Sequence, residues 1–409
     1  MSEAANGEAM TYEKTSWGVK AMILAGGPAV GLALGGVNIV LPKIAEELAH
    51  SEFDQLMVQF LGGIVGAAML IGAPGTGYLA DRIGLRKVLI LTYALFTVAG
   101  GAGLFLTDLK VFLVTRFFLG IAGSAAVTAS IIIVNKRLAP VERATWMGYY
   151  IAASYVATIM LHPLVGFLGN QNWHNAFFVY LTGAPLVFIA MFAFKDSEPS
   201  AQDIKGADSA SELPFMQWFP FGLAVLALFM GLITYLGVTY IPYQLAKMGV
   251  EPKMMGILML PGSFTGIVTS WFFGRARKTL SDDAAFVFAF ATTAIGGFVA
   301  AFAPDQIWVM VGFAIYGLGT GWFMPNLMFA LGKRVTGRYQ GRTAGFVKAC
   351  NYVGYPLSIA LFGHFALVYG NWVPILAWGV LAAILTLVYA VRVVNGRTGA
   401  PTAAAGGAS

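Results

Sequence analysis

Twelve long apolar segments divide this sequence, and they restrict its fold more than any other feature. Each runs for about twenty residues or more, the length that a helix needs to cross a hydrocarbon layer of roughly 30 Å. None shows the alternation of a membrane-barrel strand, so helices remain the way to satisfy the backbone inside a bilayer. Only 11% of the 409 residues are charged, whereas soluble domains carry roughly 25%. The sequence therefore predicts an all-α membrane protein with twelve transmembrane helices.

The apolar segments fall into two groups of six around a polar break, DSEPSAQDIKGADSASEL at 196–213. The predicted spans are 17–47, 52–80, 86–106, 109–135, 142–169, 173–195, 214–246, 252–274, 283–303, 306–332, 340–368 and 371–394. The composition of the break is that of a flexible linker. We therefore expect a cytoplasmic tail at 1–16, a six-helix half at 17–195, a cytoplasmic linker, a second six-helix half at 214–394 and a cytoplasmic tail at 395–409.

The basic residues indicate the orientation. With both termini placed in the cytoplasm, 19 of the 25 lysines and arginines fall in cytoplasmic segments, 4 fall outside and 2 lie within spans. Such an excess marks the cytoplasmic side. We expect a multi-pass protein of the cell membrane, the inner membrane if the source is Gram-negative, with both termini cytoplasmic. This placement accounts for the net charge of +6 without a nucleic-acid partner, and no cofactor or metal is expected.

The second half repeats the first. Shifting it by 197 residues pairs Gly120 with Gly317 and Gly148 with Gly345 without a gap. The same shift pairs two dipeptides, Lys136-Arg137 with Lys333-Arg334 and Tyr155-Val156 with Tyr352-Val353. Self-similarity at a fixed period indicates a repeated architecture. The expected fold is therefore two parallel six-helix halves.

One polar loop carries a motif. GYLADRIGLRK, Gly77 to Lys87, resembles the signature of the major facilitator superfamily: glycine, three residues, aspartate, arginine, any residue, glycine and then basic residues. RFFLGIAGSAA, with Arg116 and Gly120, and Pro74 above the signature resemble the drug:proton antiporter branch with twelve spans. The antiporter motif expected in span 142–169 is degenerate, HPLVGF, which weakens the hypothesis of export by proton antiport.

The resemblance implies a conformational latch at the cytoplasmic membrane edge. Its residues would be Gly77, Asp81, Arg82, Gly84, Arg86 and Lys87. Gly77 would let a neighbouring helix approach closely, and Gly84 would permit a tight turn. Asp81 would accept hydrogen bonds from a helix N-terminus and from arginines of adjacent loops. For Arg86 and Lys87 the alternative is an anchor of positive charge on the inner side.

Two cations lie within spans, whereas all nineteen acids lie in loops, tails or span ends. An ionised side chain at mid-bilayer costs at least about 2.5 kcal/mol and usually marks a pathway. Arg116 and Lys348, one in each half, therefore predict a positive cavity that clamps an anionic substrate. In the alternatives, Lys348 snorkels to the membrane edge, and Arg116 is a structural residue satisfied by backbone carbonyls.

Polar residues recur at helical spacing in two spans, 142–169 and 340–368. Tyr150, Ser154, Thr158 and His162 follow one another at intervals of four, and Lys348, Asn351, Tyr352 and Tyr355 share nearly one face. In the family that the chain resembles, both spans line the pore. The predicted substrate-binding residues are Arg116, Lys348, Asn351, Tyr352, Tyr355, Tyr150, Ser154 and Thr158. Hydrogen bonding between helices is the alternative.

Proton coupling is assigned to two candidates, His162 and Arg116. Histidine is the side chain that ordinarily titrates near neutral pH, and His162 is the histidine that lies well within a span. The alternative for His162 is a hydrogen-bonded wall residue.

Together these features predict a secondary transporter that moves a small organic solute by alternating access. The chain contains no GxxxxGK[ST] motif for ATP, and no carboxylate pair or serine–histidine arrangement within the spans suggests an enzyme. The preferred substrate is an organic anion or an amphiphile with an anionic head, with proton coupling left open. The alternatives are a broad-specificity drug:proton antiporter for multidrug efflux and a non-transporting receptor or scaffold. The expected partners are the solute, the lipid bilayer and, if coupled, protons, with the protein as a monomer.

Overall fold

The fold is that of two helical bundles, each built from six membrane-length segments. The computed structural model describes residues 16–138, 140–194, 219–276, 279–335 and 339–395. Within these ranges, 12 helical segments are long and apolar enough to cross a membrane. The predicted fold class is confirmed, whereas the linker at 196–213 lies outside the described residues.

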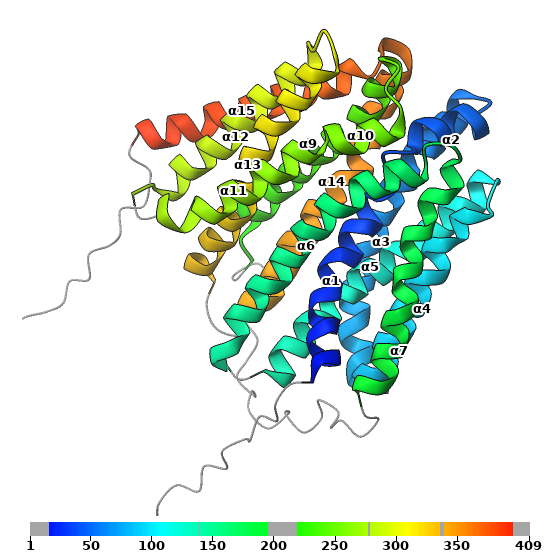
Figure 1. The fold of residues 1–409 in the computed structure, drawn as a ribbon. Coiled ribbons are helices and arrows are strands. Elements are labelled where there is room, and N and C mark those ends of the chain that lie inside the picture. The colour runs from blue at the N-terminus through cyan, green and yellow to red at the C-terminus, as the bar shows by residue number, and fades with distance from the viewer. Residues whose placement is uncertain (1–15, 139, 195–218, 277–278, 336–338, 396–409) are drawn as a thin grey trace, which may run out of the picture.

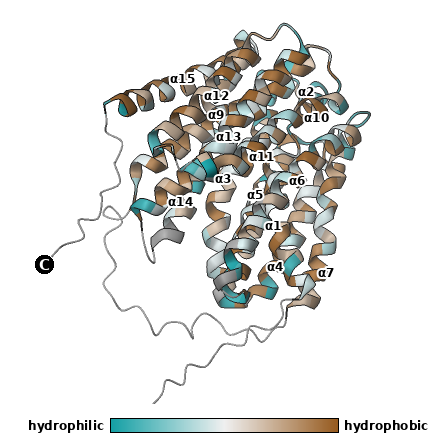
Figure 2. Cartoon of the chain, turned by 60° about the vertical axis from the view of Figure 1, so that its left-hand side comes forward, coloured by the Kyte–Doolittle hydropathy of each residue, from teal (hydrophilic) through white to brown (hydrophobic). Residues whose placement is uncertain are grey.

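The first bundle contains α1 (Trp17–Gly35), α2 (Leu41–Leu48), α3 (Glu52–Ile83), α4 (Leu85–Gly101), η1 (Ala102–Leu104), α5 (Leu109–Arg137), α6 (Pro140–Leu168), η2 (Trp173–Thr182) and α7 (Gly183–Ala193). The second contains α9 (Phe221–Lys247), α10 (Pro252–Leu258), α11 (Leu260–Ala276), α12 (Asp282–Ala301), α13 (Gln306–Arg334), α14 (Tyr339–Tyr369) and α15 (Trp372–Val394). Hydrophobic residues cover most of the helix lengths, and hydrophilic ones gather toward the helix ends (Figure 2).

The prediction of one span over 17–47 is wrong at its end. The helix α1 stops at Gly35, the chain turns, and α2 begins at Leu41 as a separate short helix. Two adjacent glycines weaken a helix by about 1 kcal/mol each, and Pro42 favours the first turn of a new helix. The span predicted at 252–274 matches one membrane-length segment, Pro252–Ala276, in which a turn at Met259 separates α10 from α11.

The internal repeat is visible in how helices begin and cross. Asp108 and Asp305 lie 197 residues apart, and each accepts hydrogen bonds from two amides in the first turn of its helix, α5 or α13. Gly120 of α5 lies against the backbone of α3, and Gly317 of α13 lies against the backbone of α11. Equivalent glycines therefore permit equivalent close crossings in the two bundles.

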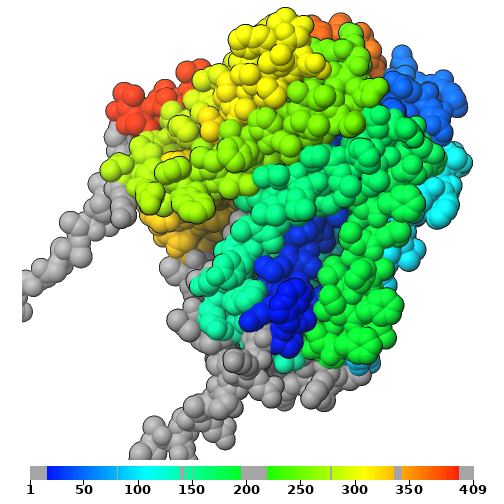
Figure 3. Space-filling model, in the orientation of Figure 1, coloured from blue at the N-terminus to red at the C-terminus, as the bar shows by residue number. Residues whose placement is uncertain are grey.

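Among the described residues, the two bundles pack against each other mainly at one end. We name the end that carries α2 and α10 the closed end, and the end where α1 begins and α15 finishes the open end (Figure 1). At the closed end α3 packs on α14, and α6 packs on α10 and α11. Toward the open end α6 separates from α11, as Figure 3 shows on one face of the molecule.

Glycines mark both ends of this interface. At the closed end several glycines are in contact with the opposite bundle, among them Gly66, Gly166, Gly256 and Gly363. At the open end four others have no atom within 4 Å of where a Cβ would lie: Gly77, Gly148, Gly274 and Gly345. In α3, α6 and α14 the two glycines are 11 or 18 residues apart, close to whole numbers of turns, so the open-end glycine lies on the same helix face as the packed one. Gly256 belongs to α10 and Gly274 to α11, on either side of the turn at Met259.

Candidate substrate site between the two bundles

A buried polar layer joins the bundles at the closed end. The Tyr355 hydroxyl of α14 donates to Asn38 Oδ1 over 2.8 Å, and the Tyr240 hydroxyl of α9 donates to Gln59 Oε1 of α3 over 2.9 Å. Tyr235 stacks on Tyr355 with ring centroids 4.1 Å apart. Asn38 and Gln59 are 1% and 2% exposed, so this layer blocks passage at the closed end.

Sequence reasoning missed Asn38 and Gln59 and listed Tyr355 as a substrate ligand. Asn38 and Gln59 each interrupt an apolar stretch of the sequence, and this was the sequence signal that could have indicated a functional role. A buried amide requires a hydrogen-bond partner, but the sequence alone does not show that the partner belongs to the other bundle.

Lys348 lies between the bundles on the open side of this layer. Its Nζ lies 5.9 Å from the centroid of the Tyr352 ring, one helical turn away on α14. Tyr150 of α6, in the first bundle, is within electrostatic range of both Lys348 and Tyr352. Lys348 therefore lies beside one tyrosine of its own helix and within electrostatic range of one tyrosine of the other bundle.

The polar stripe on α6 has a different position from the one expected. Beyond Tyr150, its members face successive glycines of α1, spaced four apart. The pairs are Ser154 with Gly27, Thr158 with Gly31 and His162 with Gly35. The Ser154 and Thr158 hydroxyls donate to carbonyls of their own helix, over 3.0 and 2.9 Å. The pore-lining hypothesis is therefore corrected for Ser154 and Thr158, because small and hydroxylated residues here allow close helix packing.

Asn351 requires the same correction. Its amide Nδ2 donates to the Ala227 carbonyl of α9 over 3.0 Å, and the residue is 9% exposed. Asn351 and Ser154 lie 197 residues apart, and each packs against the first helix of its own bundle. The contact stabilises the α9–α14 crossing, which explains a polar residue on this helix without a ligand.

The predicted clamp between Arg116 and Lys348 is not formed. Arg116 is fully buried within the first bundle, and its Nη2 donates to the Ala99 and Gly100 carbonyls over 3.1 and 2.9 Å. Its guanidinium carbon lies 5.0 to 5.2 Å from the centroids of three rings, those of Phe112, Phe177 and Tyr180. Carbonyls at the end of α4 and aromatic faces compensate part of the buried charge, whereas Nε and Nη1 have no hydrogen-bond partner among the described residues. These contacts join α4, α5 and η2.

His162 lies near the closed end of α6, away from Lys348 of α14. The backbone of Gly256 packs on the His162 carbonyl, and the ring Nε2 faces Gly35 of α1. Its Nδ1 has no hydrogen-bond partner among the described residues.

Gly84 has a φ of +86°, which confirms the tight turn between α3 and α4. Gly77 does not support a close helix approach in this structure, because its Cβ position is open. The Arg86 guanidinium donates to the Met191 carbonyl at the end of α7, over 2.8 Å from Nη2. It therefore anchors α4 to α7 within one bundle.

Of the remaining latch residues, the structure describes the side chains of Arg82 and Lys87 but not that of Asp81. The guanidinium of Arg82 lies 4.4 Å from the centroid of Tyr78, a residue of the same helix, and Lys87 is exposed. The side chain of Asp81 lies outside the described residues, so its predicted contacts stay a prediction.

Two repeated six-span bundles, closed at one end by polar contacts and open at the other, define the architecture of a membrane transporter. The chain matches the Major Facilitator Superfamily over residues 23–283. It belongs to that superfamily, as the resemblance of its signature loop predicted, and is a secondary transporter.

Several characterised proteins are similar over much of their length. The tetracycline resistance protein, class B, of Escherichia coli is 22% identical over 375 residues, covering 87% of this chain and 91% of that protein. The 3-(3-hydroxy-phenyl)propionate transporter of Escherichia coli K12 is 26% identical over 245 residues, covering 56% and 57%. The solved structure of the nucleoside transporter NupG superposes with a TM-score of 0.70 at 13% identity, over 91% of this chain and 99% of that one.

Proposed function

We propose that this protein transports a small organic anion with an aromatic or otherwise apolar body by alternating access. In this proposal the solute binds between the bundles beside Lys348, and the closed layer around Tyr355 and Tyr240 is one of two gates. Transport, rather than enzymatic chemistry, is the whole activity, and the protein acts as a monomer.

The observation that carries the proposal is the position of Lys348. Its Nζ lies 5.9 Å from the Tyr352 ring, with Tyr150 of the other bundle within electrostatic range, and the acids of the described residues lie at or near helix ends or in loops. A cation with no acid to neutralise it favours a carboxylate, phosphate or sulfonate. The tyrosine rings offer apolar faces and hydroxyl donors for the remainder of the solute.

The similarity to a 3-(3-hydroxy-phenyl)propionate transporter supports this class of solute. That substrate combines a carboxylate with a phenolic ring, and Lys348 with Tyr150 and Tyr352 offers complementary groups for both. The identity of 26% over 56% of the chain supports the class and leaves the individual compound open.

Support for alternating access comes from the glycines of the interface. At the closed end they permit contact between the bundles, and at the open end their equivalents have free space on the same helix faces. If the bundles rocked against each other, the closed-end glycines would separate and the open-end glycines would come into contact. At the open end α3 would then close on α14, and α6 would close on α11. The absence of a Cβ at Gly148 and Gly274 would then allow the second gate to close tightly.

The excess of basic residues supports an orientation with both termini in the cytoplasm. In that orientation the open end faces the cytoplasm, and the structure is the cytoplasm-facing state. The signature loop lies at this open end, so the proposed latch residues, Asp81 and Arg82 among them, would be released here. They would engage the second bundle when the cytoplasmic gate closes.

The test is a comparison of solute binding to purified Lys348→Gln, Lys348→Arg and wild-type protein. A hydrogen bond to a charged group contributes about 1.5–3 kcal/mol, so Lys348→Gln should weaken binding of an aromatic carboxylate by about 10- to 150-fold. Lys348→Arg should recover part of this loss because the charge remains. Lys333→Gln, which removes a lysine at the end of α13 paired with Asp282, is the matched control and should bind normally.

A second candidate, a drug:proton antiporter, is favoured by similarity to the tetracycline resistance protein along 87% of the chain. A screen of thermal stabilisation by anionic, cationic and neutral solutes separates the two candidates, since a ligand that binds the folded state raises its apparent stability. Stabilisation by cationic drugs alone, with Lys348→Gln unchanged, would replace the anion proposal with the antiporter.

A further inference from the structure

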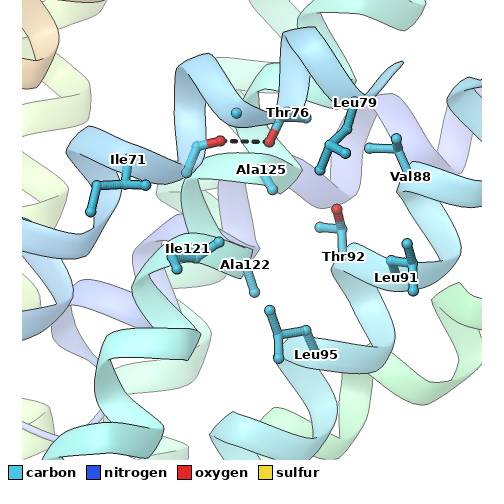
Figure 4. Close-up of a pocket in the computed structure, with 12 residues that line it drawn as sticks. Ile71, Thr76, Leu79, Val88, Leu91, Thr92, Leu95, Ile121, Ala122 and Ala125 are labelled. Carbon is cyan, nitrogen blue, oxygen red and sulfur yellow. Dashed lines mark hydrogen bonds between the residues drawn. The ribbon is translucent and has the colours of Figure 1, made fainter. Parts of the chain in front are cut away.

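A groove lies away from the interface, on the side of the first bundle. The helices α3 and α4 diverge over α5 and enclose a groove of about 270 Å³ (Figure 4). Its floor is formed by small residues of α5, Ala122 and Ala125, which are 0% and 6% exposed. The groove is therefore a gap between packed helices and not a shallow surface irregularity.

The groove opens sideways, where the protein meets the membrane. Three apolar residues at its rim are exposed: Ile71 by 58%, Leu79 by 43% and Leu91 by 57%. All three belong to membrane-length helices, so their exposed surface contacts lipid. An occupant can enter from the hydrocarbon layer without crossing water.

One polar group points into this apolar space. Thr92 is 5% exposed, and its hydroxyl is directed into the groove (Figure 4). It makes no hydrogen bond within the described residues, whereas the hydroxyl of Thr76 nearby donates to the Gly72 carbonyl over 2.7 Å. Thr92 lines the groove, and its hydroxyl is available to donate to an acceptor on an occupant.

Two basic residues, Arg82 and Lys87, lie toward the end of the groove nearest the signature loop. Arg82 follows Leu79 by three residues on α3, and Lys87 precedes Leu91 by four on α4, so each lies about one turn beyond a rim residue. Both side chains are exposed. Lys87 and Thr92 are five residues apart, about 7.5 Å along the helix.

We propose that this groove binds one acyl chain of an anionic phospholipid from the leaflet at the open end. The chain fills the apolar groove, Thr92 donates to the ester carbonyl, and Arg82 and Lys87 bind the phosphate. The groove volume of about 270 Å³ is below the roughly 300–1,000 Å³ of sites for drug-sized ligands, and it accommodates part of one acyl chain. Basic residues at a membrane edge favour anionic lipids. The proposal does not depend on which solute is transported.

The experiment uses the full-length protein in vesicles that contain phosphatidylglycerol or phosphatidylcholine with a photoactivatable group on one acyl chain. Labelled peptides are measured by mass spectrometry. In phosphatidylglycerol, labelling at residues 121–125 should exceed that around Val114, which faces lipid on the same helix with 56% exposure, by at least about fivefold. Ala122→Leu/Ala125→Leu, which fills the groove, should abolish the excess, and Val114→Leu is the control that should retain it.

Two further variants keep the proposal testable if the filled groove does not fold. Thr92→Val retains the shape and should lower phosphatidylglycerol labelling by about 2- to 13-fold, the equivalent of one neutral hydrogen bond. Arg82→Gln/Lys87→Gln should remove the preference for phosphatidylglycerol over phosphatidylcholine. Equal labelling at 121–125 and at Val114, or equal labelling by the two lipids in the wild type, would overturn the proposal. Competition by a transported solute would instead make the groove a solute site and would also overturn it.

Discussion

The closed gate offers the most direct test of alternating access. Two tyrosine hydroxyls, those of Tyr355 and Tyr240, donate across the interface to Asn38 and Gln59 over 2.8 and 2.9 Å. Tyr355→Phe/Tyr240→Phe removes both bonds and leaves both amide oxygens without these partners while the gate stays closed. When the gate opens, water can satisfy the amides, so the loss falls mainly on the closed-gate state.

The expected magnitude follows from these two bonds. Each contributes about 0.5–1.5 kcal/mol net, so the double variant should shift the equilibrium by about 1–3 kcal/mol, or about 5- to 150-fold, toward the state with the other end closed. Spin labels at Glu142 of α6 and Arg275 of α11, near the open ends of those helices, report the change. The single cysteine, Cys350, is first replaced by serine.

In the double variant, we expect a larger fraction of the molecules to have a short distance between the two spin labels. Tyr180→Phe is the matched control, because its hydroxyl donates to the Leu32 carbonyl over 3.0 Å within the first bundle. It should lower the free energy of unfolding without changing the label distance. If the double variant gave the same distance distribution as Tyr180→Phe, the reasoning about this gate would be refuted.

Three further substitutions test individual residues. Arg116→Gln should lower the midpoint of thermal unfolding and leave solute affinity unchanged, because its guanidinium binds only groups of the first bundle in the described residues; a specific loss of affinity would restore its role as a ligand. His162→Gln should abolish accumulation driven by a pH gradient and leave solute exchange intact if this histidine carries the coupled proton, whereas retained accumulation would assign the proton elsewhere. Asp81→Asn should slow transport in reconstituted vesicles strongly while binding persists, and full transport rates would contradict the proposed latch.

The fold could be predicted from the sequence because its determinants are local. A run of apolar residues long enough to cross the membrane forms a helix wherever it lies, since the bilayer provides no other partner for its backbone. Polar breaks also placed some boundaries: the spans predicted to begin at 109 and 306 begin there in the structure, each after a capping aspartate. The error at Gly35 arose because a glycine pair weakens a helix without fixing where the chain turns.

The site could be predicted only in part. Helical spacing correctly put Tyr150, Ser154 and Thr158 on neighbouring positions of one helix, but spacing does not say which neighbour the face meets. The structure places Ser154 and Thr158 against glycines of α1 and Tyr150 within electrostatic range of Lys348 on the other bundle. A difference of a fraction of a turn around the helix axis decides whether a side chain packs against a neighbouring helix or faces the space between the bundles.

The sequence by itself determined that this chain spans a membrane twelve times, in two repeated halves, with the signature of its superfamily. Only the tertiary structure decided what the two intramembrane cations do. Arg116 meets carbonyls at the end of α4, 16 and 17 residues away in the chain, and Lys348 comes within range of Tyr150, nearly two hundred residues away. A buried charge must find compensation, but its partners are set by how helices pack, and packing depends on contacts between residues that are remote in the sequence.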